Sequence, residues 1–173
     1  MIQIGQPAPH FKEQAVIDGG DFKDISLEDF RGKWLVLFFY PLDFTSVCPT
    51  ELTQFREYLK SFQEYGAEVL GASVDSVHSH KRWIKDDLGD LGYPLIGDLK
   101  KNLARDYGVL IQGAGIATRG TFIIDPEQNI QYSCLHSPRV GRDAKEILRM
   151  LAALQSGERC PAGWNPGDKH LTS

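Results

Sequence analysis

The chain has 173 residues, of which 42% are hydrophobic and 24% are charged, a balance typical of one soluble globular domain. Its net charge of -4 gives no basic footprint for a nucleic acid, and no apolar run approaches the roughly 20 residues that cross a membrane. Three cysteines are too few for a disulfide scaffold and favour reactive thiols. The N-terminal segment lacks the pattern of a signal peptide, so we expect a cytoplasmic protein.

The first half of the chain predicts strands that alternate with helices. Residues 34–40, WLVLFFY, are continuously apolar, as in a strand covered on both faces. Residues 50–66 have apolar side chains at helical spacing and end in a glycine, which predicts one helix. Residues 67–74, AEVLGASV, predict a second buried strand. Residues 75–83 begin with Asp and Ser, both suitable helix caps, and predict another helix.

The second half predicts a helix over 99–108 and then a β-hairpin. The segments GTFIID and NIQYSCL flank a turn at 126–129. Residues 141–154 form an amphipathic pattern that predicts a last helix. We therefore expect residues 1–154 to form one α/β domain, a mixed sheet flanked by helices on both faces.

The C-terminal segment, residues 155–173, differs in character from the rest. It is rich in glycine and proline and has little periodicity, so we expect an arm and not a core element. The arm holds Cys160 and Trp164. Apolar anchors in a tail usually pack on another surface.

Cys48 lies between a predicted strand and a predicted helix, in the stretch PLDFTSVCPTEL (41–52). The thiolate is the nucleophilic form, and a free cysteine with a pKa of about 8.5 is only a few per cent ionised at neutral pH. Pro49 suits the first helical position, so we expect Cys48 as the N-cap, where the helix dipole favours a negative sulfur. The hydroxyl of Thr45 could hydrogen-bond to the sulfur or to an incoming oxygen. The alternative is a small buried hydrophobe, but the flanking hydroxyls and proline favour a reactive thiol.

The chain resembles the peroxiredoxins, and among them the typical two-cysteine alkyl hydroperoxide reductase C group. The pattern Pro-x-x-x-Thr-x-x-Cys is present and is extended by Pro-Thr-Glu. The later blocks RGTFIID, VGRDAKEILR and CPAGWNPG also match. Together these blocks supply the candidate site residues Pro41, Thr45, Cys48, Glu51, Arg119, Arg142 and Cys160.

The resemblance implies a thioredoxin-like fold and the reduction of hydrogen peroxide and organic hydroperoxides. Cys48 would be the peroxidatic cysteine, which attacks the terminal peroxide oxygen and becomes a sulfenic acid. Pro41 would shield the site, while Thr45 and Arg119 would hold the peroxide oxygens in line with the sulfur. Without the resemblance, Arg119 would be interpreted as an ordinary residue that pairs with a surface carboxylate.

The resemblance also implies a second half-reaction that involves another subunit. Glu51 and Arg142 would form a salt bridge that orients Arg119. Cys160 of the partner subunit would condense with the sulfenic acid to give an intersubunit disulfide, and Cys160 and Trp164 would lie on a neighbour's surface. We expect a homodimer that assembles into a decamer, thioredoxin or a flavoprotein disulfide reductase as the reductant, no cofactor, no metal, and no nucleic acid or membrane partner.

Three features depart from the family pattern. Ser46 stands where the family usually has an aromatic residue, which leaves the substrate preference open. The loop LGDLGYPLI also lacks the insertion of the easily over-oxidised members, so we expect a site that unfolds readily and resists excess peroxide. Cys134 has no counterpart in the family, and its place in a predicted strand favours a packed, inert thiol.

Two alternative functions remain beside the peroxidase, and one alternative mechanism remains within it. The protein could act as a ring-forming holdase chaperone, or as a relay that passes oxidation to a partner. A one-cysteine mechanism is a third alternative, although the motif around Cys160 argues against it.

His78 and His80 do not share a helical face, so we expect solvated side chains and not a metal site. Trp34, Trp83 and the segment 38–44 are expected in the core.

Overall fold

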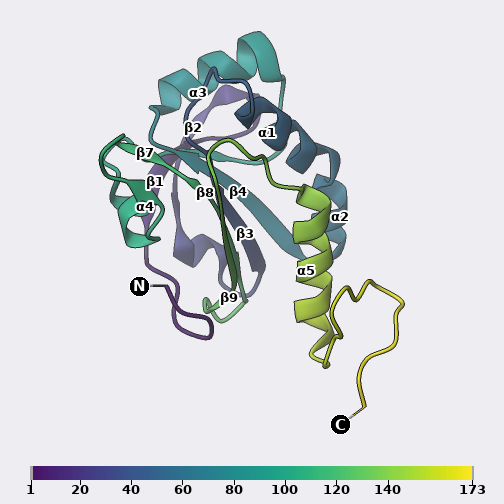
Figure 1. Ribbon diagram of the computed structural model, residues 1–173. Coiled ribbons are helices and arrows are strands. Elements are labelled where there is room, and N and C mark those ends of the chain that lie inside the picture. The colour runs from purple at the N-terminus through teal and green to yellow at the C-terminus, as the bar shows by residue number, and fades with distance from the viewer. Residues whose placement is uncertain (1, 173) are drawn as a thin grey trace.

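The computed structural model describes residues 2–172, which form a seven-stranded mixed sheet with helices packed against it (Figure 1). The strand order is β2-β1-β5-β4-β3-β8-β9. The strands are β1 (Lys12–Val16), β2 (Phe22–Ser26), β3 (Trp34–Phe39), β4 (Ala67–Ser73), β5 (Leu95–Gly97), β8 (Arg119–Ile124) and β9 (Ile130–His136). A separate two-stranded ribbon consists of β6 (Leu110–Ile111) and β7 (Ile116–Ala117). The α/β class expected from the sequence is confirmed.

Five α-helices accompany the sheet in the described residues. They are α1 (Cys48–Glu57), α2 (Leu59–Glu64), α3 (Val77–Trp83), α4 (Asn102–Asp106) and α5 (Ala144–Ser156). A π-helical turn over Ile84–Leu88 continues α3, and short 3-10 turns cover Asp18–Gly20 and Leu27–Phe30. Within residues 2–172, none of these helices is long and apolar enough to span a membrane.

The inner strand β3 is covered on both faces, as its unbroken apolar sequence predicts. Its alternating side chains enter two separate cores. Leu35, Leu37 and Phe39 pack with residues of α4 and of the N-terminal strands. Val36, Phe38 and the following Tyr40 pack with α1, α2 and α5. Cys48 belongs to this second core, so the strand directly supports the first turn of α1.

The strand pairings determine where Cys48 and Arg119 lie relative to each other. β3 pairs in parallel with β4 and antiparallel with β8, and β8 forms the predicted hairpin with β9. Arg119 is the first residue of β8, and Cys48 follows the carboxyl end of β3. Because β3 and β8 are antiparallel neighbours, the end of β3 and the start of β8 lie at the same edge of the sheet.

Four sequence predictions about helices require correction. The helix expected over 99–108 covers only Asn102–Asp106, because Lys101 before it has a left-handed backbone. The helix expected over 50–66 is interrupted at Tyr58, whose φ of -94° and ψ of 2° end α1 before α2 begins. Val47 is the N-cap of α1, so Cys48 is its first residue and not its cap. The last helix begins at Ala144, capped by the Asp143 side chain, and it extends to Ser156. Cys48 nevertheless remains at the positive end of the α1 dipole.

The C-terminal arm folds back onto its own chain. Trp164, expected on a neighbouring subunit, is only 5% exposed within this single chain. Its carbonyl accepts a hydrogen bond from Arg149 of α5 at 2.6 Å, and its indole N–H donates to the carbonyl of Asp168 at 3.1 Å. Its ring stacks on His170. In the isolated chain, Trp164 is therefore packed and hydrogen-bonded within its own subunit.

Candidate active site

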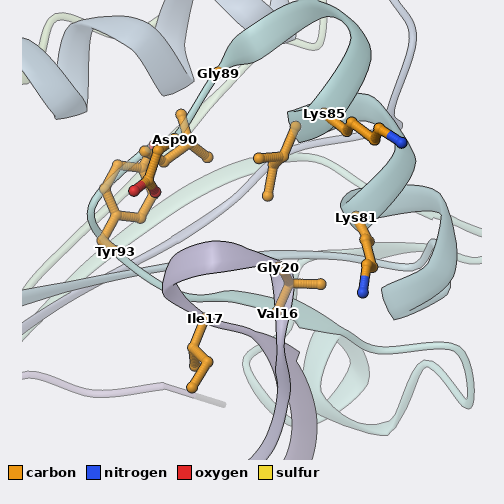
Figure 2. Close-up of a pocket in the computed structure, with 10 residues that line it drawn as sticks. Val16, Ile17, Gly20, Lys81, Lys85, Gly89, Asp90 and Tyr93 are labelled. Atoms are coloured by element: carbon orange, nitrogen blue, oxygen red, sulfur yellow. The ribbon is translucent and has the colours of Figure 1, made fainter.

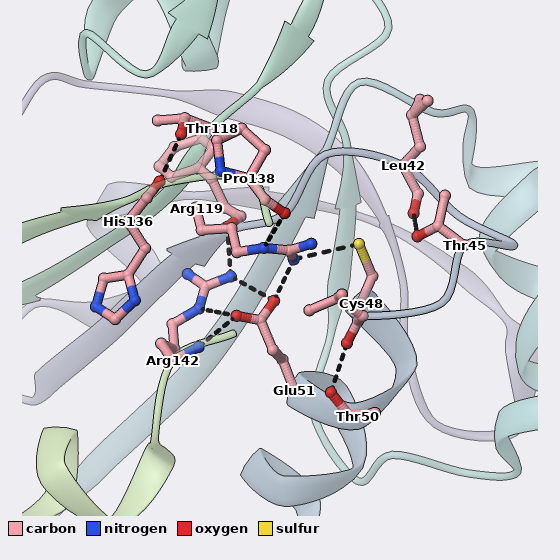
Figure 3. A network of polar contacts seen from close by, with 12 residues as sticks. Leu42, Thr45, Cys48, Thr50, Glu51, Thr118, Arg119, His136, Pro138 and Arg142 are labelled. Atoms are coloured by element: carbon pink, nitrogen blue, oxygen red, sulfur yellow. Dashed lines mark hydrogen bonds and ion pairs between the residues drawn. The ribbon is translucent and has the colours of Figure 1, made fainter. Parts of the chain in front are cut away.

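Cys48 is buried at the start of α1, where its sulfur faces a buried arginine. The thiol residue is only 1% exposed, and Nη1 of Arg119 donates a hydrogen bond to Sγ at 3.3 Å (Figure 3). A guanidinium N–H stabilises a thiolate more than a neutral thiol, because the interaction is assisted by charge. The helix end and Arg119 therefore act on the sulfur in the same direction.

Glu51, one turn after Cys48, binds both arginines of the site. Its Oε2 accepts from Nη1 of Arg119 at 2.6 Å and from Nη2 of Arg142 at 3.0 Å, and its Oε1 accepts from Nε of Arg142 at 2.9 Å (Figure 3). The backbone N–H of Arg142 also donates to Oε1, at 2.8 Å. Burial raises the pKa of Glu51, but the hydrogen bonds and charge of Arg142, with the charge of Arg119, outweigh burial and lower that pKa below its ordinary value.

Both arginines are also held by backbone carbonyls. Nε of Arg119 donates to the carbonyl of Pro138 at 3.0 Å. Arg142 donates to the carbonyl of Gly120 at 2.7 Å and to that of Phe39 at 2.6 Å. Arg142 thus ties α5, β8 and β3 to Glu51, while Glu51 fixes the guanidinium of Arg119 beside the sulfur. Such a network is rigid before any substrate arrives, as preorganised stabilisation of developing charge requires.

A pocket of about 430 Å³ opens above the sulfur. Its lining is Pro41, Leu42, Thr45, Ser46, Val47, Cys48, Ile116, Arg119, Pro138 and Arg139. Thr45 faces this pocket but does not contact the sulfur here, since its hydroxyl donates to the carbonyl of Leu42 at 2.9 Å (Figure 3). The hydroxyl oxygen can still accept a hydrogen bond from a substrate. Pro41 is buried at the pocket wall.

A second hollow, of about 320 Å³, lies between the end of β1 and the turn that follows α3 (Figure 2). Its apolar floor includes Val16 and Leu91, and Lys81 and Lys85 stand exposed at its rim. The hydroxyl of Tyr93 is already used, because it donates to the carbonyl of Leu52. Its lining contains no cysteine, and its charged side chains Lys81, Lys85 and Asp90 are exposed, so the reactive thiol belongs to the Cys48 pocket.

His80 is a residue of the site region that sequence reasoning misplaced. It was expected to be solvated, but it is fully buried. Its Nε2 donates to the carbonyl of Ile96 at 2.9 Å, and its Nδ1 lies 2.7 Å from Oδ2 of Asp43. Asp43 also accepts a hydrogen bond from the hydroxyl of Tyr40 at 2.8 Å. Because Asp43 lies within the loop that leads to Cys48, His80 anchors that loop to α3.

Other aromatic predictions had mixed outcomes. Trp83 is buried as expected, at 2% exposure, whereas Trp34 is only partly buried. Phe44, expected in the core, is 54% exposed and has a φ of +55°. This left-handed backbone conformation is costly for a residue with a side chain, and it marks the sharp turn that brings Thr45 toward the pocket.

The other two cysteines lie away from this network. Cys160 is half-buried against its own α5, with Sγ 3.4 Å from Oγ of Ser156 and 3.8 Å from the carbonyl of Ala153. The Cys48 site lies near the opposite end of α5, which Arg142 precedes. Because this helix of 13 residues is about 20 Å long, Cys160 lies far from Cys48 within one chain. Cys134 lies in β9 as predicted, but it is only partly buried. All three thiols are free.

Within residues 2–172, no cluster of three or more acidic, histidine or cysteine side chains could hold a metal ion.

Comparison with known proteins places this arrangement in a family. Residues 4–133 match the model of the AhpC/TSA family. The chain belongs to this family, and it is a peroxiredoxin of the AhpC type. A mitochondrial thioredoxin-dependent peroxide reductase of Drosophila melanogaster is 48% identical, over 99% of this chain and 76% of the relative.

Solved structures agree with the sequence comparison. Reduced 2-Cys peroxiredoxin of Plasmodium vivax superposes with a TM-score of 0.94 at 36% identity, over 96% of this chain and 91% of that one. AhpC of Mycobacterium tuberculosis gives a TM-score of 0.85 at 38% identity, over 95% of this chain and 99% of that one. The thioredoxin-like fold implied by the sequence motifs is thereby confirmed.

Proposed function

We propose that this peroxiredoxin reduces hydrogen peroxide and organic hydroperoxides through Cys48 and Cys160. The observation that carries the proposal is the contact between Sγ of Cys48 and Nη1 of Arg119, inside a network closed by Glu51 and Arg142. Since the sulfur receives a charged donor at a helix start and faces an open pocket, it has both the activation and the access that a nucleophile needs.

In the first step, the Cys48 thiolate attacks the terminal oxygen of the peroxide. The S–O bond forms as the O–O bond breaks, and the departing oxygen takes a proton to leave as water or an alcohol. Arg119 would stabilise the negative charge that moves from sulfur to the leaving oxygen. Thr45 would accept a hydrogen bond from the peroxide hydroxyl, and Pro41 would limit access of water to the sulfur.

In the second step, Cys160 of the partner subunit would attack the Cys48 sulfenic acid, form the S–S bond and release water. The position of Cys160 supports an intersubunit reaction, because in one chain it lies beyond the far end of α5 from the site. For this reaction, either the arm would leave its own α5, or the Cys48 site of the partner would approach the arm at α5. Two subunits would then exchange arms in a symmetric homodimer.

The reductant of the disulfide and the assembly are further parts of the proposal. The name of the Drosophila relative, a thioredoxin-dependent reductase, supports thioredoxin over a flavoprotein disulfide reductase. We propose that the dimers form a decamer and that the protein works in the cytoplasm. No cofactor is needed, because both electrons of the peroxide reduction come from the two cysteines.

The test is to add one equivalent of hydrogen peroxide to the reduced protein and map cysteine linkages by mass spectrometry. The proposal predicts a covalent dimer joined by Cys48 and Cys160. The Cys134→Ser variant is the matched control and should give the same product. A sulfenic acid at Cys48 without the bond would mean a one-cysteine or relay mechanism. An unmodified Cys48 would refute the peroxidase proposal.

A further inference from the structure

The pocket above Cys48 is larger than hydrogen peroxide requires, and its lining includes apolar, polar and charged side chains. Its 430 Å³ could hold a hydroperoxide with a substantial alkyl group. One wall is apolar, formed by Ile116 at the β6–β7 ribbon and by Pro138. Ser46, which also lines the pocket, is small and exposed. The pocket therefore has room and an apolar surface for carbon atoms of a substrate.

The charges around the pocket do not cancel. The two buried arginines of the network, Arg119 and Arg142, share the carboxylate of Glu51, and Arg119 also donates to the Cys48 sulfur. Arg139 also lines the pocket, and it is exposed. The lining contains no aspartate or glutamate, and among residues 2–172 the Arg139 guanidinium forms no ion pair. One positive charge at the pocket is thus left for a ligand, although the chain as a whole has a net charge of -4.

We propose that this site favours organic hydroperoxides that carry a carboxylate on their alkyl chain, and that Arg139 determines this preference. The inference rests on the proposed peroxidase function. The peroxide group would meet Cys48 and Arg119, the alkyl chain would lie along Ile116 and Pro138, and the carboxylate would pair with Arg139 at the rim. Hydrogen peroxide has neither a chain nor a charge, so its reduction would not depend on Arg139.

The chemistry of the step is that of the proposed function. The Cys48 thiolate gains an oxygen and becomes a sulfenic acid, while the hydroperoxide loses that oxygen and leaves as the corresponding hydroxy-carboxylate. Arg139 neither forms nor breaks a bond. It would lower KM by holding the end of the substrate remote from the reacting oxygen, which makes it a specificity residue and not a catalytic one.

The experiment compares two tertiary alkyl hydroperoxides, one with a carboxylate on a short chain and the other its methyl ester, with hydrogen peroxide as the internal reference. For the native chain we expect kcat/KM for the acid to exceed that for the ester about fivefold at low salt, the size of an exposed ion pair. The Arg139→Gln variant should lose this preference and Arg139→Glu should reverse it. The hydrogen peroxide rate of each variant is measured in parallel, and the acid and ester rates are expressed relative to it.

Arg105→Gln is the matched control, because it removes the same charge from an exposed site on α4, whose core lies on the other face of the sheet. It should keep the preference for the acid. Equal rates for acid and ester in the native chain, or a preference that survives Arg139→Gln, would overturn the inference while normal hydrogen peroxide turnover left the proposed function intact. Failure of the native chain to reduce hydrogen peroxide would instead overturn the proposed function, and the inference with it.

Discussion

The surroundings of Cys48 and Cys160 differ in how firmly they are built. Cys48 lies in a core and faces a buried arginine that is held by the buried carboxylate of Glu51 and by a backbone carbonyl. Cys160 is half-buried in an arm without regular secondary structure, which Arg149 and Trp164 fasten to α5. The difference suggests a division of roles. A rigid site suits the step in which charge must be stabilised, and a loosely held arm suits the step in which one sulfur must reach another.

The largest effect expected is the loss of one thiol from each region. Cys48→Ser should abolish peroxide consumption, because a serine hydroxyl is not ionised at neutral pH and is a poor nucleophile toward peroxide. Cys160→Ser should still consume one equivalent of peroxide rapidly and then stop with thioredoxin as reductant. Stopped-flow measurement of peroxide loss checks both variants. A normal first turnover by Cys48→Ser would disprove the assignment of the reactive thiol.

The second prediction concerns the buried charges of the rigid region. Glu51→Gln leaves Arg119 and Arg142 without their shared carboxylate, and breaking such a buried pair costs about 3 kcal/mol or more. Urea unfolding should show this loss, together with slower reaction of Cys48. Glu57→Gln, at an exposed position of the same helix, is the control and should change the unfolding free energy by less than about 0.5 kcal/mol. A Glu51→Gln variant of unchanged stability would show that the network does not support the fold.

The pH dependence of stability follows from the same carboxylate. The pKa of Glu51 is lower in the folded chain than its ordinary value of 4.5. Its stabilising contribution is therefore complete above the unfolded pKa and is lost as pH falls through the folded pKa, below about 4.5. Unfolding measured across this acidic range should show a shallower loss of stability for Glu51→Gln than for the native chain. Parallel curves would contradict the assignment.

The smallest effect on global stability is expected in the arm. Trp164→Ala removes the anchor on α5 and should release Cys160, so that a thiol reagent labels Cys160 faster while Cys48 reacts at its native rate. Because the arm lies outside both hydrophobic cores, Tm should fall by only a few degrees. Labelling followed by peptide mass spectrometry distinguishes the two cysteines. Equal acceleration at both would mean that the arm and the site unfold together.

The sequence predicted the parts of the fold whose patterns are local. The apolar run of β3, the strand β4 and the β8–β9 hairpin have the expected positions because burial on both faces and a strong turn are visible in a few residues. The strands β1, β2, β5, β6 and β7 were not predicted. β2 has mostly exposed side chains. β5 has only three residues, so its strand conformation depends on pairing with neighbouring strands.

The site was predictable only in part for a similar reason. The loop around Cys48 indicated a reactive thiol by itself, but the roles of Glu51, Arg119 and Arg142 came from the family resemblance, because these residues meet only in the folded chain. The contact between His80 and Asp43 joins residues 37 positions apart, and no pattern of spacing shows such a partner. Whether Cys160 serves another subunit depends on a second chain.

The most direct test of this division of roles mixes two inactive variants. Cys48→Ser chains and Cys160→Ser chains, unfolded and refolded together, should form mixed dimers in which Cys48 of one chain faces Cys160 of the other. The account predicts that peroxidase turnover with thioredoxin, absent from either variant alone, returns in the mixture. Absence of turnover in mixed dimers confirmed by native mass spectrometry would contradict it, because each chain would then have to supply both sulfurs to its own site.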